Sequence, residues 1–468
     1  MKIHSSAPLL AFCALTPLHG TETKTPIGLR ADGSPIHAWI SAASFQVNHP
    51  APHVLVVGPA PLDTQGWTVT RVEPPDASLA FPPKGTAYTG AEREAQVLWR
   101  WALALGPDAV AGSDRLSRAL VASGSVRDWN PKETNPSPAR LELRQRLDRT
   151  PLTVARQLGT HYGHAFDKIA YIPAVALIGR LHVAKLLGDE STVQAVVRLA
   201  HSAPIPQAPD GPTLAGHLIF AALAGYGRDD EALHRVRFAA STALSAEGTP
   251  LPVVPNHREM SDAVFLNGPI LAAAGRLTGD PRYYQAALNH LRFMRKLCLR
   301  PDGLYRHSPL TEAAWGRGNG FPALGVTLML SDWPASVPGR DELLQNLQDH
   351  LAALAPHQDE SGLWHQVIDH PESYREFSCT CMIAFALARG MREGWLERSR
   401  FESSCQRAWE AIKLRIDRDG KELVDVCAGT DKQVSLENYF LRPAILGRDD
   451  RGGAMALLLA AELARTGQ

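Results

Sequence analysis

Two stretches decide the fold: residues 271–275 read Leu-Ala-Ala-Ala-Gly, and residues 382–388 read Met-Ile-Ala-Phe-Ala-Leu-Ala. Each lies in a predicted helix whose side chains are small or apolar on every side. A helix without a polar face is buried among its neighbours rather than laid on a surface. Both stretches therefore predict helices at the centre of a large α-helical domain.

Helix patterns continue in pairs from about residue 137 to the end of the chain, separated by breaks that contain Gly, Asp or Pro. After one or two lead-in helices, the predicted pairs are 169–187 with 191–200, 213–224 with 230–243, 262–277 with 281–296, 312–330 with 341–354, 374–389 with 400–415, and 435–446 with 453–465. Six pairs predict a mainly α domain over residues 136–468, an (α/α)6 barrel whose inner ring takes the first helix of each pair. An open superhelix of helical hairpins is the alternative, because periodicity alone does not close a ring.

The first 135 residues have a different pattern, with frequent Pro and Gly and only short apolar runs. Residues 36–40 and 54–58 are typical of strands, and residues 91–105 are typical of an amphipathic helix. This pattern predicts a small α/β domain over residues 21–135, ahead of the barrel.

Residues 1–20 resemble a secretory signal peptide, because Lys2 and His4 precede an apolar stretch that ends near Leu18. The alternative is a disordered N-terminus of a cytosolic protein. The first interpretation predicts a periplasmic or secreted protein, and the second predicts a cytoplasmic one.

The composition argues against several classes of function. The 468 residues hold 48 Lys and Arg against 48 Asp and Glu, so the chain lacks the basic excess of nucleic-acid-binding or membrane-surface proteins. No apolar run reaches the ~18 residues of a membrane span. The six cysteines are scattered, without the paired spacing of zinc sites or disulfide frameworks. Neither nucleic acid nor a membrane is therefore expected as a partner.

The predicted topology places functional side chains at one mouth of the barrel, if the inner helices run parallel. Each helix N-terminus offers free backbone N–H groups and about half a positive charge, which attract carboxylates and other anions. Asp210 and Asp262 stand just before predicted inner helices. The structural alternatives are a plain helix N-cap for Asp262 and a turn residue for Asp210.

Residues 315–321, Trp-Gly-Arg-Gly-Asn-Gly-Phe, are the hardest to explain by structure alone. Three alternating glycines at a helix start cost about 1 kcal/mol each relative to Ala, and they suit a backbone that approaches a ligand closely. Arg317 would present a planar pair of donors to a carboxylate. Trp315 and Phe321 would flank it as faces for sugar stacking or for packing.

These motifs together resemble glycoside hydrolase family 105 and, more distantly, family 88. The matching blocks are 260–262 with 268–269, 277–284, 302–307, 315–321, and 362–367 with 376–378. The resemblance covers about residues 150–468 and keeps order and spacing across four predicted inner helices. It implies an (α/α)6 barrel that acts on unsaturated uronic acids at the non-reducing end of oligosaccharides made by polysaccharide lyases. Unsaturated rhamnogalacturonyl hydrolases are the type members.

The resemblance also implies roles for individual residues. Asp262 corresponds to the acid/base, and Asp210 is the nearest candidate for a second carboxylate. Contacts with the substrate are expected from His307, Trp315, Arg317, Asn319, Phe321 and Trp364. For Trp364, a place in the core is the alternative. No metal or cofactor is implied, and the expected partner is an oligosaccharide capped by an unsaturated uronic acid.

Two positions depart from the family pattern. Met260 stands where a Trp is common, two residues before the acid/base, and Phe321 stands where a Trp usually ends the glycine block. Both changes reduce the aromatic area at the expected sugar site. Two alternatives therefore stay open: a hydrolase of saturated uronides or a sugar epimerase on the same barrel, and a non-catalytic carbohydrate-binding or scaffold protein.

In the N-terminal domain, residues 29–36, 54–58 and 90–94 faintly resemble parts of zinc carboxypeptidases of the M14 type. The His-x-x-Glu zinc pair expected just after Gly58 is absent from the sequence. A shortened, non-catalytic remnant with a packing or accessory role is therefore predicted.

Overall fold

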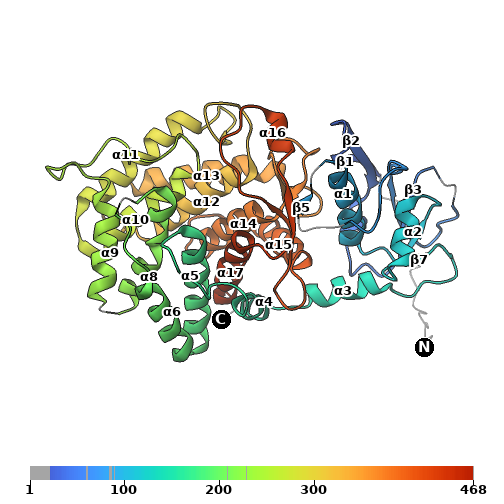
Figure 1. The fold of residues 1–468 in the computed structure, drawn as a ribbon, viewed down its shortest axis with the longest axis horizontal. Helices are drawn as coiled ribbons and strands as arrows, with labels where there is room; N and C mark the ends of the chain where they lie inside the picture. Colours follow the sequence, from blue (N-terminus) through green and yellow to red (C-terminus); the bar gives the residue numbers. More distant parts are fainter. Residues whose placement is uncertain are drawn as a thin grey trace, which may run out of the picture.

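The computed structural model describes residues 22–59, 62–83, 87–88, 90–207, 209–227 and 229–466. An N-terminal α/β domain and a larger helical domain lie side by side, and helix α3 (Pro138–Leu147) runs from one to the other (Figure 1). The predicted leader at residues 1–20 lies outside the described residues. Across the described chain, no helix is long and apolar enough to cross a membrane.

Inner helices occupy six positions of a ring within the described residues. In chain order they are α5 (Tyr171–Leu187), α7 (Gly211–Gly216) with α8 (Leu218–Tyr226), α10 (Ala263–Thr278), α12 (Gly316–Ser331), α14 (Phe377–Arg392) and α17 (Asp450–Thr466). Each one contacts the next, and α17 contacts α5, so the ring returns to its start. The stretches at 271–275 and 382–388 are buried on this ring, as their all-round apolar composition predicts.

A second set of helices lies outside this ring and packs against it. Its members are α4 (Pro151–Gly159), α6 (Glu190–Ser202), α9 (Asp230–Ser241), α11 (Pro281–Cys298), α13 (Arg340–Leu354) and α15 (Arg398–Leu414). These helices are amphipathic: on α11, Tyr283, Ala287, Leu291 and Met294 are buried at spacings of three and four. The two rings confirm the predicted mainly α architecture of (α/α)6 type.

The predicted sixth pair is wrong. Residues 435–446 form the short helix α16 (Leu436–Phe440) and the strand β11 (Ala444–Gly447), not an inner helix. The sixth inner helix is α17, and its outer partner is α4 from the beginning of the domain. The second predicted inner helix is also divided, between α7 and α8 at His217. Local periodicity misses the sixth pair because its two helices lie about 300 residues apart.

The N-terminal domain holds a six-stranded sheet in the described chain, of order β1-β2-β4-β3-β6-β7. The strands are β1 (Thr23–Leu29), β2 (Pro35–Ile40), β3 (His53–Val57), β4 (Thr68–Val72), β6 (Ala109–Ala111) and β7 (Arg127–Asp128). Strand β3, buried at every residue, pairs in parallel with β4 and β6, as expected for a central apolar strand. The short helix η1 (Ala42–Phe45) and the helices α1 (Gly90–Leu105) and α2 (Arg115–Ala122) complete the predicted α/β domain.

The two domains share secondary structure and core. Strand β5 (Ala87–Tyr88) pairs with β11, which in turn pairs with β10 (Leu423–Cys427). One hydrophobic cluster contains Leu98 and Trp101 of α1 together with Trp315 and Tyr439 of the barrel. The remaining elements, β8 (Trp364–His365), β9 (Arg375–Glu376) and η2 (Ala355–His357), connect barrel helices. The N-terminal domain therefore packs against the mouth that holds Trp315.

Candidate active site

Aromatic rings from three inner helices meet at this mouth. Tyr171, the first residue of α5, lies 5.9 Å from Phe265 near the start of α10 and 5.7 Å from Phe321 near the start of α12, measured between ring centroids. Phe265 and Phe321 stack at 5.4 Å. Because the early residues of three inner helices touch, their N-termini share one mouth, as the topology predicted.

Asp262 lies directly before α10 and faces a histidine. Its Oδ2 is 3.1 Å from Nε2 of His307, and both side chains are almost completely buried. Asp262 occupies the N-cap position of α10, but in the described chain its side chain makes no capping hydrogen bond. Asp262 therefore stands at the N-cap position, but its carboxylate does not cap the helix.

Tyr439 orients the histidine from the other side. Its hydroxyl lies 2.8 Å from Nδ1 of His307 and accepts a hydrogen bond from the backbone N–H of Gln433 at 3.3 Å. Burial raises the pKa of Tyr439 to about 12, so the phenol keeps its proton. That proton can be donated to Nδ1, which leaves the hydrogen of a neutral imidazole on Nε2, facing Asp262.

Trp315 and Arg317 complete this cluster. The Trp315 ring lies 4.3 Å from the His307 ring, and the Arg317 guanidinium lies 4.7 Å from the Trp315 ring. Arg317 donates to the backbone carbonyls of Cys427 at 2.7 Å and Ala428 at 2.9 Å. Burial lowers the pKa of Arg317, but the neighbouring Cys427 and Glu376 outweigh this effect and the net shift is upward. The Arg317 guanidinium is therefore charged, and two of its nitrogens already donate to backbone carbonyls.

Glu376 binds the same segment, at Cys427. Its carboxylate accepts the backbone N–H groups of Ser378 at 3.0 Å and Cys379 at 2.5 Å, as the N-cap of α14. It also accepts the N–H of Cys427 at 2.9 Å. Glu376 thus fixes the end of β10 against α14, at the point where Arg317 binds it.

A loop of residues 428–435 borders the cluster, where Ala428 accepts from Arg317 and Gln433 donates to Tyr439, and we call it the covering loop. Asp431 forms an ion pair with Arg258 at 2.7 Å, and Lys432 one with Glu259 at 3.4 Å. Asn256, Arg258 and Glu259 have φ values of 66°, 50° and 55°, a left-handed conformation that non-glycine residues rarely adopt. The covering loop is therefore latched to a strained segment just before Asp262.

The cluster is closed to solvent in this conformation. His307 is 0 % exposed, Trp315 1 %, Arg317 3 % and Asp262 8 %. Among the described residues, no acceptor reaches the buried indole N–H of Trp315. A polar side chain that is buried without a partner is costly, which favours a site that a ligand completes.

The other predicted site residues lie in different surroundings. Asp210 caps α7 by accepting the N–H of Thr213 at 2.9 Å, and no interaction within the described residues joins it to Asp262. Asn319 is fully buried and bonds both backbone groups of Tyr305 at 2.8 Å. The indole N–H of Trp364 donates to Leu354 in the barrel core at 2.8 Å. Asn319 and Trp364 thus support the fold around the site.

The glycines of residues 315–321 also have structural partners. A Cβ on Gly316 would lie 2.6 Å from the carbonyl oxygen of His365, and one on Gly320 would lie 3.1 Å from the sulfur of Met382. These glycines let α12 approach neighbouring protein segments. Close packing against these segments is enough to explain the glycines, without a ligand.

Sequence reasoning missed Tyr171, Tyr439, the covering loop, and the pair formed by Asp449 and Arg451 at 2.8 Å. Burial raises the pKa of Tyr171, and the charges of Arg317, Asp262 and Arg451 reach its hydroxyl. Tyr439 lies in residues 435–446, which were predicted to form an inner helix. Asp449 does carry a usable signal, since an Asp before a glycine-containing apolar helix is a typical N-cap.

Comparison with known proteins identifies the barrel. Residues 251–467 match the family model described as Glycosyl Hydrolase Family 88. Over this region the chain is similar to glycoside hydrolase family 88. A possible family 105 member from Salmonella enterica has the same fold at a TM-score of 0.57 and 24 % identity, covering 73 % of this chain and 97 % of that one.

Two named hydrolases are similar to parts of this chain. The unsaturated rhamnogalacturonyl hydrolase YesR of Bacillus subtilis is 30 % identical over 187 residues, which is 38 % of this chain and 52 % of that protein. The structure of the unsaturated glucuronyl hydrolase from Bacillus sp. GL1 matches at a TM-score of 0.52 and 17 % identity, over 69 % of this chain and 97 % of that one. The chain spans about half the length of the curated relatives it matches.

Proposed function

We propose that this protein hydrolyses oligosaccharides that carry a 4,5-unsaturated uronic acid at the non-reducing end. The carrying observation is the Asp262 carboxylate, which stands at a helix N-terminus without capping it and faces His307 at 3.1 Å. The similarity to unsaturated rhamnogalacturonyl and rhamnoglycuronyl hydrolases supports the same substrate class.

The first step is a proton transfer to carbon. The C4=C5 double bond of the substrate is conjugated to the ring oxygen as an enol ether, so C4 is its basic carbon. Protonated Asp262 donates its proton to C4, and the former π electrons form the new C4–H bond. The positive charge that develops is shared between C5 and the ring oxygen. The Asp262 carboxylate formed in this step stabilises that charge.

The second step adds water to C5. The same carboxylate takes a proton from the water as its oxygen bonds to C5, which returns Asp262 to its acid form. The resulting hemiketal opens by breaking the bond between C5 and the ring oxygen. The hemiacetal left at C1 then collapses and releases the rest of the oligosaccharide. His307 holds Asp262 in place during both transfers, and one carboxyl group is enough for the cycle.

Substrate entry requires the covering loop to move. The predicted contact residues His307, Trp315 and Arg317 expose almost no surface while Asp431 and Lys432 are latched. Entry of the sugar between Trp315 and the loop would let the uronate carboxylate reach Arg317 and the free indole N–H.

A pair of matched disaccharides tests this function. One carries the unsaturated uronate, and the other carries the saturated uronic acid on the same second sugar. We expect release of the second sugar from the unsaturated compound only. Equal release from both would indicate a hydrolase of saturated uronides. Binding without release would indicate a carbohydrate-binding protein.

A further inference from the structure

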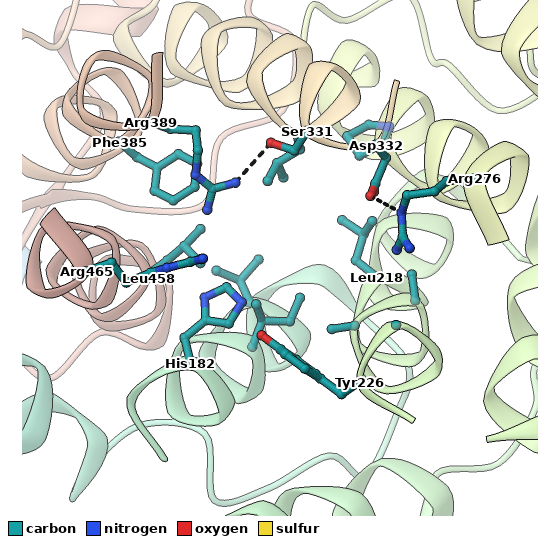
Figure 2. Close-up of a pocket in the computed structure, with 17 residues that line it drawn as sticks. His182, Leu218, Tyr226, Arg276, Ser331, Asp332, Phe385, Arg389, Leu458 and Arg465 are labelled. Atoms are coloured by element: carbon teal, nitrogen blue, oxygen red, sulfur yellow. Dashed lines mark hydrogen bonds and ion pairs between the residues drawn. The ribbon is translucent and has the colours of Figure 1, made fainter. Parts of the chain in front are cut away.

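The opposite mouth of the barrel contains a cavity of about 260 Å³ to which every inner helix contributes (Figure 2). Apolar side chains line its deeper part, among them Val175, Leu218, Leu328, Phe385 and Leu458. The volume is slightly below the ~300–1,000 Å³ typical of pockets for drug-sized ligands, which limits the ligand to a small molecule.

Basic side chains surround the entrance of this cavity. Figure 2 shows Arg389, Arg465 and His182 directed into one space, with the Tyr226 hydroxyl beside them. Arg276 lies across the entrance, where its Nε donates to Asp332 at 2.6 Å. The entrance thus gathers guanidinium groups from three inner helices.

The acidic groups nearby do not balance these cations. Glu462 accepts both Arg389 at 2.6–2.8 Å and Arg392 at 2.7 Å, and it lies 4.0 Å from Arg465. One carboxylate is therefore shared by three guanidiniums. Arg392 also pairs with Glu393 at 2.7 Å. With this pair and that of Arg276 and Asp332 added, four positive charges stand against three negative ones.

The cavity also holds a polar atom without a partner. Nδ1 of His182 is buried, and no hydrogen bond reaches it among the described residues. Burial lowers the pKa of His182 to about 3, and the charge of Arg389 acts in the same direction. The imidazole is therefore neutral at physiological pH and can offer either a donor or an acceptor at Nδ1.

Capping of helix C-termini does not explain the arginines. Basic residues in the last turn of a helix commonly bond its free carbonyls. In the described chain, Arg276 and Arg389 instead donate to Asp332, Glu462 and Ser331. Among the described residues, the carboxylate within ion-pair distance of Arg465 is that of Glu462, at 4.0 Å. These side chains are directed at carboxylates and at the cavity, which is the arrangement of an anion site.

We propose that this cavity binds a small organic anion, with its apolar body against the inner helices and its carboxylate between Arg465, Arg389 and His182. Arg465 has the weakest contact with Glu462 and is the guanidinium most available to a ligand. Arg276 closes the other side of the entrance. The site lies at the opposite end of the barrel from Asp262, and the proposal does not depend on the proposed function.

Calorimetric titration of the full chain with benzoate tests the site, with benzamide as a neutral molecule of the same shape. We expect saturable binding of benzoate and none of benzamide. Arg465→Gln removes one charged hydrogen bond and should weaken benzoate binding at least about tenfold. Arg276→Gln should weaken it to a smaller extent.

The control is Arg292→Gln, which removes the same charge from an exposed pair with Glu342 on the outer ring. It should bind benzoate like the unaltered protein. Thermal melting of each variant checks that the barrel is intact. Absence of benzoate binding to the unaltered protein, or equal affinity in all three variants, would overturn the proposal.

Discussion

The two mouths of the barrel are formed by opposite ends of the same inner helices: acidic residues precede the helices at one end, and a group of arginines stands near the other. Asp262, Glu376 and Asp449 stand at the helix N-termini, whereas Arg276, Arg389 and Arg465 stand near the C-termini. This arrangement complements the helix dipoles at both ends. Several groups depart from that role, however. Within the described residues, the Asp262 side chain makes no capping hydrogen bond. The arginines bond side chains rather than helix carbonyls, and Arg465 lies 4.0 Å from Glu462.

The two mouths differ in which side chains already bond the backbone of the fold. At the N-terminal mouth, Glu376 and Asp449 bond backbone N–H groups and are used by the fold. Asp262 instead faces His307 at 3.1 Å, and it is the group that we propose for proton transfer. At the C-terminal mouth, burial lowers the pKa of His182 to about 3, so this imidazole carries no charge at neutral pH. The proposed catalytic group and the proposed anion site therefore lie at different ends of the barrel.

Replacing an aspartate at each mouth tests this assignment most strongly. Asp262→Asn should lower kcat about 10²- to 10⁴-fold, because it removes the general acid and base. Asp280→Asn changes an N-cap of the outer helix α11 near the opposite mouth and should leave kcat within about twofold. Steady-state release of the second sugar measures both. Similar losses in the two variants would contradict the division of roles.

Glu462→Gln should destabilise the barrel by about 3 kcal/mol, because it leaves the buried Arg389 without a carboxylate and leaves Arg392 with Glu393 alone. Burial raises the pKa of Glu462, but its arginine partners outweigh this and lower it from 4.5 to about 2. The stabilisation is thus complete above about pH 4.5 and is lost as the pH falls towards 2. Urea unfolding at neutral and acidic pH should show a pH dependence that the variant lacks. A variant as stable as the parent at neutral pH would refute the ion-pair account.

Tyr439→Phe removes the hydroxyl that orients His307. A lost hydrogen bond of about 1 kcal/mol predicts a kcat about five- to tenfold lower, with little change in KM. The pH profile of kcat should shift, because His307 no longer holds one tautomer against Asp262. Tyr284→Phe is the matched variant at the other mouth, where the hydroxyl donates to Asp332 at 3.2 Å. If both variants kept the parent pH profile, Tyr439 would have only a packing role.

Arg258→Gln breaks one latch of the covering loop and should have the smallest effect. Exposed ion pairs contribute about 0.2–1 kcal/mol, so kcat/KM should rise no more than about fivefold at low salt. The difference should vanish at high salt, where the latch is screened. Arg398→Gln, in an exposed pair with Glu402 on α15, is the control. A salt-independent change, or one in the control as well, would show that the latch does not govern access.

The sequence was sufficient for the parts of the molecule that rest on local pattern. The stretches at 271–275 and 382–388 identify α10 and α14, because a helix that is buried on every side has small or apolar residues at all its positions. Asp262, His307, Trp315 and Arg317 were likewise found from short motifs, and the fold brings these four together.

Features that depend on distant contacts could not be found this way. The partners of Arg317 lie 110 and 111 residues away in sequence, and Tyr439 lies 132 residues from His307. The inner ring closes where α17 contacts α5, and the outer partner of α17 is α4, from the opposite end of the domain. Asp210 is a separate case, because its capping bond to Thr213 is local. The motif alone could not distinguish a capping carboxylate from a free one.

The most direct test of the central claim is the reaction in heavy water with an unsaturated uronide, followed by NMR. Asp262 exchanges its proton with solvent, so its transfer to the sugar should place deuterium at C4 in step with loss of the double bond and release of the second sugar. Asp262→Asn should slow all three together. Release of the second sugar with the double bond intact, or a C4 that gains only protium, would contradict the account.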